Sequence, residues 1–185
     1  DFTQRRVQQW QQQVQQTLMG APGLLRLPRH AEEAAALQNI NTKLGLDTSI
    51  VEWSDAAEAS ALAGVKLATG AAWVKQGSWV AAAALCRVLL DHPNITTREK
   101  VEVQALVREE NHWYATLSDG EMLQAETVIV ANAHAANTLL PVKLPLGITS
   151  GQVSLFDAKN ASAIPQVILC HKGYLVARDD TVLIG

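Results

Sequence analysis

The chain has 185 residues, a formal net charge of −3, 48% hydrophobic residues and 18% charged residues. This composition is typical of a folded domain and excludes an intrinsically disordered chain. The small negative charge gives no general attraction to nucleic acids or to anionic membranes. Because no apolar stretch reaches the roughly 20 residues that span a bilayer, we expect no membrane partner.

Few residues carry an obvious chemistry. Cys86 and Cys170 both lie in apolar runs, which predicts two reduced, packed thiols and favours a cytoplasmic protein. A disulfide or a reactive thiol is the alternative. The histidines show no metal-ligand spacing, so no metal site is expected. The sequence also lacks the G-x-G-x-x-G, G-x-x-x-x-G-K-[ST], H-E-x-x-H and C-x-x-C motifs.

The first 20 residues are rich in glutamine, yet their apolar residues recur every three or four positions. These residues are Val7, Trp10, Val14 and Leu18. The spacing predicts a surface helix that ends between residues 20 and 23.

Residues 23–64 alternate between expected strands and expected helices. A short strand is predicted at 23–28 and another at 49–53. A helix is predicted at 31–45, where Gly45 ends it. A second, short helix follows, with Ser54 or Asp55 as its N-cap and Glu58 in its first turn.

The middle of the chain predicts elements of a covered sheet. Residues 79–90 are apolar nearly all round, which is typical of a buried helix. Residues 101–108 alternate as a half-buried strand does, and a hairpin turned at residues 119–120 follows. Residues 127–131, "TVIVA", show no polar alternation and predict the central strand of a sheet covered by helices.

The last 45 residues predict a second sheet of the antiparallel type. Three stretches read as strands, "GITSGQVSLF", "QVILCHKGYLVA" and "TVLIG". Turns are expected at Gly173 and at residues 179–180.

One stretch, "TVIVANAHAANTLLP" at 127–141, suggests a ligand site. Ligands of open α/β sheets collect at the carboxyl ends of the central strands. The small residues there would allow a flat ring or a diphosphate to approach the backbone. The alternative is a tight strand-to-helix turn without a ligand.

Six blocks, in order, carry a resemblance to a known family. They are "GLLRL", "GAAWVKQGSWV", "VEVQALV", "TVIVANAH", "LPLGITSGQVSLF" and "QVILCHKGYL" leading to "TVLIG". In these blocks residues 20–185 resemble the FAD-dependent oxidoreductase half of the bifunctional tRNA 5-methylaminomethyl-2-thiouridine biosynthesis proteins (MnmC). That family belongs to the D-amino acid/glycine oxidase group.

The resemblance implies a mixed α/β (α+β) fold excised from a longer chain. Part of an FAD-binding α/β domain would stand beside an antiparallel-sheet substrate domain. Residues 1–75 and 141–185 would form the substrate domain, and residues 76–140 the central part of the FAD-binding domain. Missing N- and C-terminal segments of the parent chain would be partners of this piece.

The resemblance also implies cofactor contacts. Val103 would lie near the adenine of FAD, and Ala131, Asn132 and Ala133 near the dinucleotide. The family usually has glycine at position 133, and a Cβ there hinders close approach. By the same resemblance we expect the FAD site to be incomplete in this chain, because the diphosphate-binding fingerprint and a segment corresponding to the one beyond "LIG" would complete it. We therefore expect this piece alone to bind FAD weakly or not at all.

On the substrate side the resemblance indicates three residues. Gly77 lies in the block "QGSW" at the domain junction, where Ser78 replaces a second glycine. Gln152 and Tyr174 would lie on the sheet that covers the flavin. The alternative is that Gln152 and Tyr174 only pack in their sheet. No catalytic residue is assigned.

The implied reaction is an oxidation at a CH–NH bond. FAD would take a hydride from the bond and the imine would hydrolyse, which removes the carboxymethyl group from a modified wobble uridine of tRNA as glyoxylate. The partner of the intact enzyme would then be tRNA, although this fragment alone is expected to be inactive. One alternative is a glycine- or sarcosine-type oxidase of free amino acids. Another is a non-catalytic folded fragment or binding module.

Overall fold

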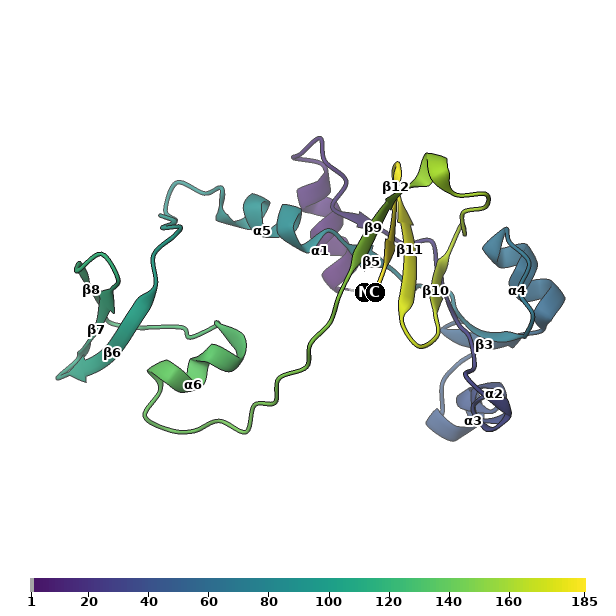
Figure 1. Cartoon of the computed structure of the whole chain (residues 1–185), viewed down its shortest axis with the longest axis horizontal. Helices are drawn as coiled ribbons and strands as arrows, with labels where there is room; N and C mark the ends of the chain where they lie inside the picture. Colours follow the sequence, from purple (N-terminus) through teal and green to yellow (C-terminus); the bar gives the residue numbers. More distant parts are fainter. Residues whose placement is uncertain (1) are drawn as a thin grey trace. The chain divides into compact units, whose positions relative to one another are not determined.

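The computed structural model describes residues 2–185, which form two compact units. The first unit combines the chain up to Asp91 with Gly151–Gly185, and the second is His92–Ser150. Helices and three sheets make up the two units (Figure 1), which confirms the predicted mixed α/β class. The boundaries between the units, after residues 91 and 150, lie 16 and 10 residues later than the predicted domain boundaries, after residues 75 and 140. The assignment of the predicted domains to substrate and to FAD stays a prediction.

A seven-stranded sheet is the frame of the first unit. Its strands, in spatial order, are β3 (Val51–Ser54), β4 (Ala71–Val74), β2 (Leu24–Arg26), β10 (Ile168–Cys170), β11 (Tyr174–Arg178), β12 (Thr181–Ile184) and β9 (Ser154–Asp157). Only β2 and β10 pair in parallel, and the other neighbours are antiparallel. The predicted antiparallel sheet is therefore present, with one parallel pair in its middle.

Two tight turns connect the last three strands of this sheet in sequence. The β10–β11 turn contains Gly173, whose carbonyl accepts a hydrogen bond from the N–H of His171 at 2.9 Å. At the β11–β12 turn Asp179 has a φ of 51°, a left-handed conformation that Asp tolerates better than most residues. Both turns lie where the sequence predicts them.

Five helices belong to the first unit. They are α1 (Phe2–Gln11), α2 (Ala31–Gln38), α3 (Ile40–Leu44), α4 (Ala56–Ala63) and α5 (Ala82–Leu90). Asp55 caps α4 in a capping box with Glu58, and Gly45 ends α3 in the left-handed conformation, both as predicted. No helix in residues 2–185 is long and apolar enough to cross a membrane.

The first unit buries two apolar clusters. Leu25 of β2 is fully buried against Ala59 and Ala63 of α4, together with Ala71 and Val167. This contact joins α4 to one face of the seven-stranded sheet. A second cluster joins α1 to α5 beside the two-stranded sheet of β1 (Met19–Gly20) and β5 (Trp79–Val80), and its buried members are Val7, Leu18, Ala81 and Ala84.

The predicted end of the first helix is wrong, because α1 ends at Gln11 instead of residues 20–23. The side-chain carbonyl of Gln11 accepts a hydrogen bond from the N–H of Leu18 at 2.5 Å, which stabilises a reversal of the chain. Val14 and Leu18 thus reach the same cluster as Val7 and Trp10, but from a loop. The apolar spacing indicated the packed residues correctly and the backbone conformation only in part.

The predicted burial of residues 79–90 is also wrong. Helix α5 starts at Ala82, and Ala84 is its only buried residue because α1 covers a single face. Leu89 and Leu90 are 43% and 47% exposed. Cys86 is exposed as well, which contradicts the predicted packed thiol at that position.

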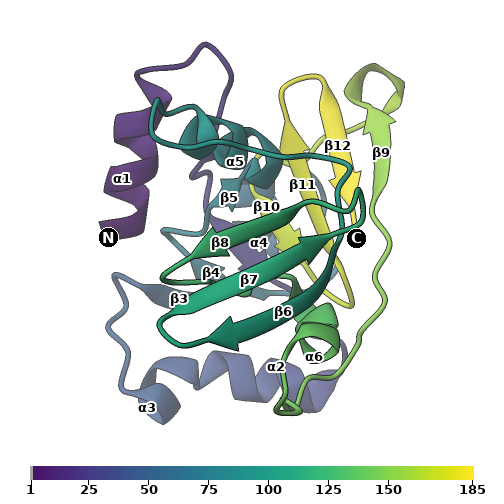
Figure 2. The same cartoon turned by 90° about the vertical axis from the view of Figure 1, so that its left-hand side faces the viewer.

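The second unit is a three-stranded meander with a short helix at its edge (Figure 2). Its strands are β6 (Val103–Glu109), β7 (His112–Leu117) and β8 (Met122–Ala125). Gly120 has a φ of +87° in the β7–β8 turn, which confirms the predicted hairpin. A 3₁₀ turn (Ala133–Ala135) leads into α6 (Ala136–Leu139).

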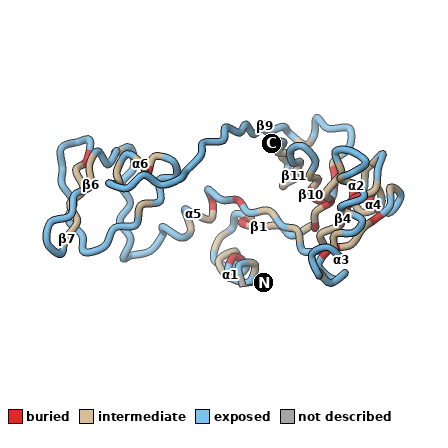
Figure 3. Tube along the Cα trace, turned by 90° about the horizontal axis from the view of Figure 1, so that it is seen from below, coloured by how far each residue is buried: buried red, intermediate tan, exposed pale blue. Residues whose placement is uncertain are grey.

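Residues 127–131 do not form the predicted central strand. Within residues 2–185 their backbone groups make no hydrogen bond, and Ile129 is 87% exposed. Figure 3 draws most of the chain around β6, β7 and α6 as exposed. An apolar run becomes a strand only where a neighbouring strand offers a hydrogen-bond ladder. Here β8 pairs with β7, and no strand of the described chain pairs with 127–131.

An ion-pair network ties the end of β2 to the first turn of α2. The Arg26 guanidinium donates to Glu33 Oε1 at 2.8 Å, and the Arg29 Nε and backbone N–H donate to Glu33 Oε2 at 2.9 and 2.7 Å. The Arg29 hydrogen bonds, followed by that of Arg26, lower the pKa of Glu33 from its ordinary value of 4.5 to about 2. The ionised Glu33 carboxylate thereby holds Arg26, at the end of β2, and Arg29, in the loop that follows, against α2.

Gly23 tests the packing next to β2. Its φ of +86° is left-handed, and an added Cβ would collide with the ring of Trp73 on the neighbouring strand β4. We expect Gly23→Ala to lower the free energy of unfolding by roughly 2–5 kcal/mol through left-handed strain and overpacking. Urea denaturation measures this change. Gly45→Ala is the control: its φ of +63° adds the same strain in open space, so only about 1–2 kcal/mol should be lost. Equal losses would contradict the collision with Trp73.

Glu33 should make stability depend on acidity. Because its pKa is lowered in the folded state, its stabilisation is complete above about pH 4.5 and is lost as the pH falls toward 2. We expect Glu33→Gln to be less stable than the wild type at neutral pH, with the difference narrowing through this window. Urea denaturation at a series of pH values measures it. Glu32→Gln removes a carboxylate from the same helical turn outside the network, and a similar pH-dependent difference there would sink the assignment.

Candidate functional site

A cavity of about 430 Å³ opens in the second unit between β6 and the segment that follows β8. Leu106 of β6 and Ala115 of β7, which are cross-strand partners, contribute to its wall from the sheet. Val128, Ile129 and Val130 line it from the unpaired segment. The remaining lining residues are Val101, Glu102, Val103, Ala131, Asn132, Ala135, Thr138 and Leu139.

The cavity is mainly apolar and has few polar groups. Asn132 and Thr138 provide neutral polar atoms, and Thr138 Oγ1 already donates to the carbonyl of Ala135 at 2.7 Å. Glu102 is the one charged lining residue, and its backbone N–H donates to Ser118 Oγ at 3.1 Å. An apolar cavity with a few polar groups is typical of a site for a flat organic ligand.

The structure brings together three of the four predicted cofactor residues. The cavity is lined by Val103 and, from a segment 28 positions later in the sequence, by Ala131 and Asn132. Ala133 does not line it and begins the 3₁₀ turn with a φ of +52°. Glycine adopts this left-handed backbone without strain and alanine does not, so the glycine expected at this position by resemblance has a conformational reason.

The residues present fit the ring portion of FAD better than its diphosphate. The backbone groups of 127–131 make no hydrogen bond within the described chain, so they can pair with the edge of a heteroaromatic ring. Apolar side chains from both walls suit the faces of such a ring. No Lys, Arg or His lines the cavity to balance phosphate charge, and the sequence lacks the fingerprint that would bind it at a helix N-terminus.

The three predicted substrate-side residues belong to the first unit, which does not gather them into one site. Tyr174 begins β11, is 40% exposed and lines a groove of about 300 Å³ with residues of the preceding turn. Gly77 lies between β4 and β5, where its carbonyl accepts from the N–H of Gly23 at 2.9 Å and an added Cβ would collide with Leu24. Gln152 is exposed in the loop before β9.

Several lining residues were missed by sequence reasoning. Leu106 lines the cavity together with Val103 because the pairing of β6 with β7 shifts register between Val103 and Ala105. The alternation in the sequence groups Val103 with Val107, so it did not indicate Leu106. Thr138 and Leu139 line it from α6, and no motif in the sequence marks them. In the described part of the chain no group of three or more His, Cys, Asp or Glu could hold a metal ion.

The chain is similar in sequence to part of larger bifunctional proteins. The tRNA 5-methylaminomethyl-2-thiouridine biosynthesis bifunctional protein MnmC of Marinobacter nauticus is 31% identical over 189 residues, covering 100% of this chain and 29% of that protein. The protein of the same name from Ectopseudomonas mendocina is 32% identical over 167 residues, with 89% and 25% covered. The chain thus spans less than a third of the length of these relatives.

Solved structures show the same fold at low sequence identity. Glycine oxidase from Geobacillus kaustophilus superimposes with a TM-score of 0.79 at 18% identity, over 100% of this chain and 52% of that one. Iminodiacetate oxidase from Chelativorans sp. BNC1 gives a TM-score of 0.77 at 19% identity, over 100% and 53%. The family model described as FAD dependent oxidoreductase matches residues 2–185, so the chain belongs to the FAD-dependent oxidoreductase (DAO) family.

Proposed function

We propose that this chain is part of an FAD-dependent enzyme that oxidises a CH–NH bond of a modified tRNA wobble uridine and so removes its carboxymethyl group. The similarity to MnmC proteins along the entire chain carries the tRNA part of the proposal. The apolar cavity of the second unit supports the cofactor part. When bound, FAD supplies the hydride acceptor, and hydrolysis of the resulting substrate imine releases glyoxylate.

The cofactor role falls to the second unit. Val103 and Asn132 approach the cavity from opposite walls and would hold the adenine portion of FAD between β6 and the segment 127–132. The apolar side chains around them exclude water from that part of the cofactor. Ala133 would lie at the edge of the same contact.

The substrate role falls to the first unit. Tyr174 presents an exposed ring and hydroxyl at the start of β11 and would contact the uridine. Gln152 would contribute an amide from the loop before β9. Gly77 would act through its backbone, since it leaves no room for a side chain against Leu24.

The fold likeness to glycine oxidase supports a second candidate, an oxidase of free amino acids such as glycine or sarcosine. Both candidates share the flavin and the CH–NH chemistry, so they differ only in the substrate. A substrate-dependent signal from the flavin separates them.

A charge placed on the cavity wall should weaken cofactor binding. We expect Val103→Asp in the full-length protein to lower FAD affinity about tenfold, or ~1.4 kcal/mol, because a carboxylate enters an apolar wall. Titration of the flavin-free protein with FAD, followed by flavin fluorescence, measures this. Val107→Asp is the matched control, since Val107 lies on the same strand, is 50% exposed and does not line the cavity. Equal weakening by both variants would remove Val103 from the cofactor site.

The substrate can be identified from the visible flavin band of the full-length protein in the absence of oxygen. We expect the band to bleach when tRNA carrying a carboxymethylaminomethyl uridine is added, because the hydride reduces the flavin. Unmodified tRNA is the control and should leave the band intact. Bleaching by glycine or sarcosine alone would favour the free amino-acid oxidase, and a full-length protein without a flavin band would exclude both candidates.

A further inference from the structure

Basic side chains gather where the two parallel strands of the first unit end. In β2 and β10, Arg26 pairs with Cys170, and the next N–H, of Leu27, donates to the carbonyl of Cys170 at 2.8 Å. Parallel neighbours end at the same edge of a sheet, so the residues that follow both strands meet there. We call these residues the strand-end cluster: Arg29, His30, His171 and Lys172.

Arg29 is anchored by Glu33, while its terminal Nη donors stay uncommitted in the described chain. Its Nε and backbone N–H both bind Glu33 Oε2, which holds the guanidinium beside the first turn of α2. Its two Nη groups have no protein partner within residues 2–185, and the side chain is 49% exposed. An anchored planar guanidinium with free terminal N–H groups suits two oxygens of a phosphate.

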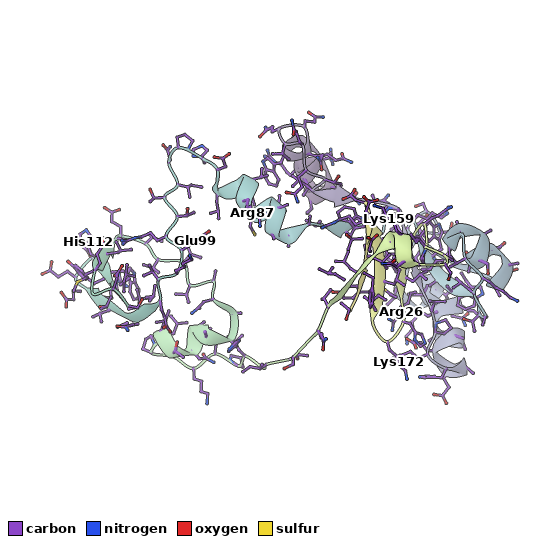
Figure 4. The ribbon with its side chains drawn as sticks, turned by 45° about the horizontal axis from the view of Figure 1, so that its top comes forward. Arg26, Arg87, Glu99, His112, Lys159 and Lys172 are labelled. Atoms are coloured by element: carbon purple, nitrogen blue, oxygen red, sulfur yellow. The ribbon has the colours of Figure 1, made fainter. Side chains whose placement is uncertain are left out.

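Lys172 follows His171 on a turn that the Arg26 side chain holds. Arg26 Nη1 donates to the carbonyl of His171 at 2.8 Å, and the turn closes through the His171 N–H and the Gly173 carbonyl. Lys172 is exposed and forms no ion pair in the described chain. Figure 4 shows Arg26 and Lys172 at the same end of the sheet.

The local charge is positive although the chain as a whole carries −3. Arg26, Arg29 and Lys172 provide three cations, and the first turn of α2 provides two carboxylates, Glu32 and Glu33. Both guanidiniums share Glu33. The three cations therefore exceed the two carboxylates by one positive charge.

An exposed aromatic ring adjoins the cluster. Tyr174 of β11 pairs with Cys170 of β10, and Cys170 pairs with Arg26 of β2, so Tyr174 and Arg26 lie in one row across the sheet with β10 between them. Its groove of about 300 Å³ is also lined by His171, Lys172 and Gly173. Cations for phosphates beside an aromatic ring for a base form the combination by which proteins bind single-stranded RNA.

We propose that the strand-end cluster, together with Tyr174, binds a single-stranded segment of RNA, with Arg29 and Lys172 on backbone phosphates and Tyr174 against a base. The inference rests on the proposed function, in which the substrate is a tRNA wobble uridine. It adds the cations that hold the backbone phosphates next to that uridine, whose base lies against Tyr174. An anticodon loop offers such unpaired nucleotides.

The test compares two lysines at opposite ends of the sheet in the full-length protein. Lys172→Glu alters the cluster, whereas Lys159→Glu makes the same change beside the β11–β12 turn, where the Ala158 N–H donates to the Asp180 carbonyl (Figure 4). Fluorescence anisotropy with a labelled anticodon stem-loop RNA gives the Kd at several salt concentrations. We expect Lys172→Glu to weaken binding roughly five- to tenfold and to reduce the salt slope by about 1, with less than twofold change for Lys159→Glu.

The outcomes separate this inference from the proposed function. Equal weakening by Lys172→Glu and Lys159→Glu would overturn the inference, because only general charge would then matter. So would unchanged RNA affinity in Lys172→Glu while modified tRNA still bleaches the flavin, a result that leaves the proposed function intact. A wild-type protein that ignores RNA and is reduced by glycine would instead remove the proposed function and this inference with it. Lys172→Gln, which removes one charge instead of reversing it, should give about half the change in log Kd.

Discussion

The parallel pairing of β2 with β10 is the contact on which the first unit depends. It joins residues 24–26 to residues 168–170, so it closes a loop of more than 140 residues. Without it the sheet would separate into one part containing β3, β4 and β2 and another containing β10, β11, β12 and β9. Contacts of such sequence separation form late and at high entropic cost, and buried apolar residues must offset that cost. Leu25, in the centre of β2, is fully buried at this seam.

The same pairing explains why the chain has two compact units. The second unit is an excursion that leaves after Asp91 and returns at Gly151, and its meander is built from neighbours in sequence. Local hairpins need no distant partner, so β6, β7 and β8 pair without the first unit. The cofactor residues predicted by resemblance fall on this locally folded unit, whereas the predicted substrate-side residues fall on the unit that needs long-range closure.

Local signals in the sequence predicted the elements whose causes are local. The capping box of Asp55 and Glu58, the left-handed Gly45 and the Gly120 hairpin lie where the pattern placed them, because each depends on a few adjacent residues. Burial could not be predicted in this way. Residues 79–90 and 127–131 are both apolar, but how far such a stretch is covered depends on elements distant in sequence.

The candidate site shows the same division. Resemblance proposed Val103, Ala131 and Asn132, and the structure places all three around one cavity, but Leu106 and Thr138 join them only through the pairing of β6 and the position of α6. The strand-end cluster was not predicted for a similar reason. Arg29 and Lys172 are 143 positions apart, and only the parallel register of β2 and β10 brings them to one edge.

The exposed segment 127–131 connects the fold with cofactor binding. Its apolar side chains line the cavity while its backbone N–H and C=O groups bond to no part of the described chain. A ligand or a neighbouring strand that supplies hydrogen bonds to these unpaired backbone groups stabilises the segment most. The backbone groups are then hydrogen-bonded when they leave water together with the apolar side chains. Binding of a flat heteroaromatic ring and ordering of this segment should therefore favour each other. The cavity wall then gains rigidity from the same contacts that give the ligand its affinity.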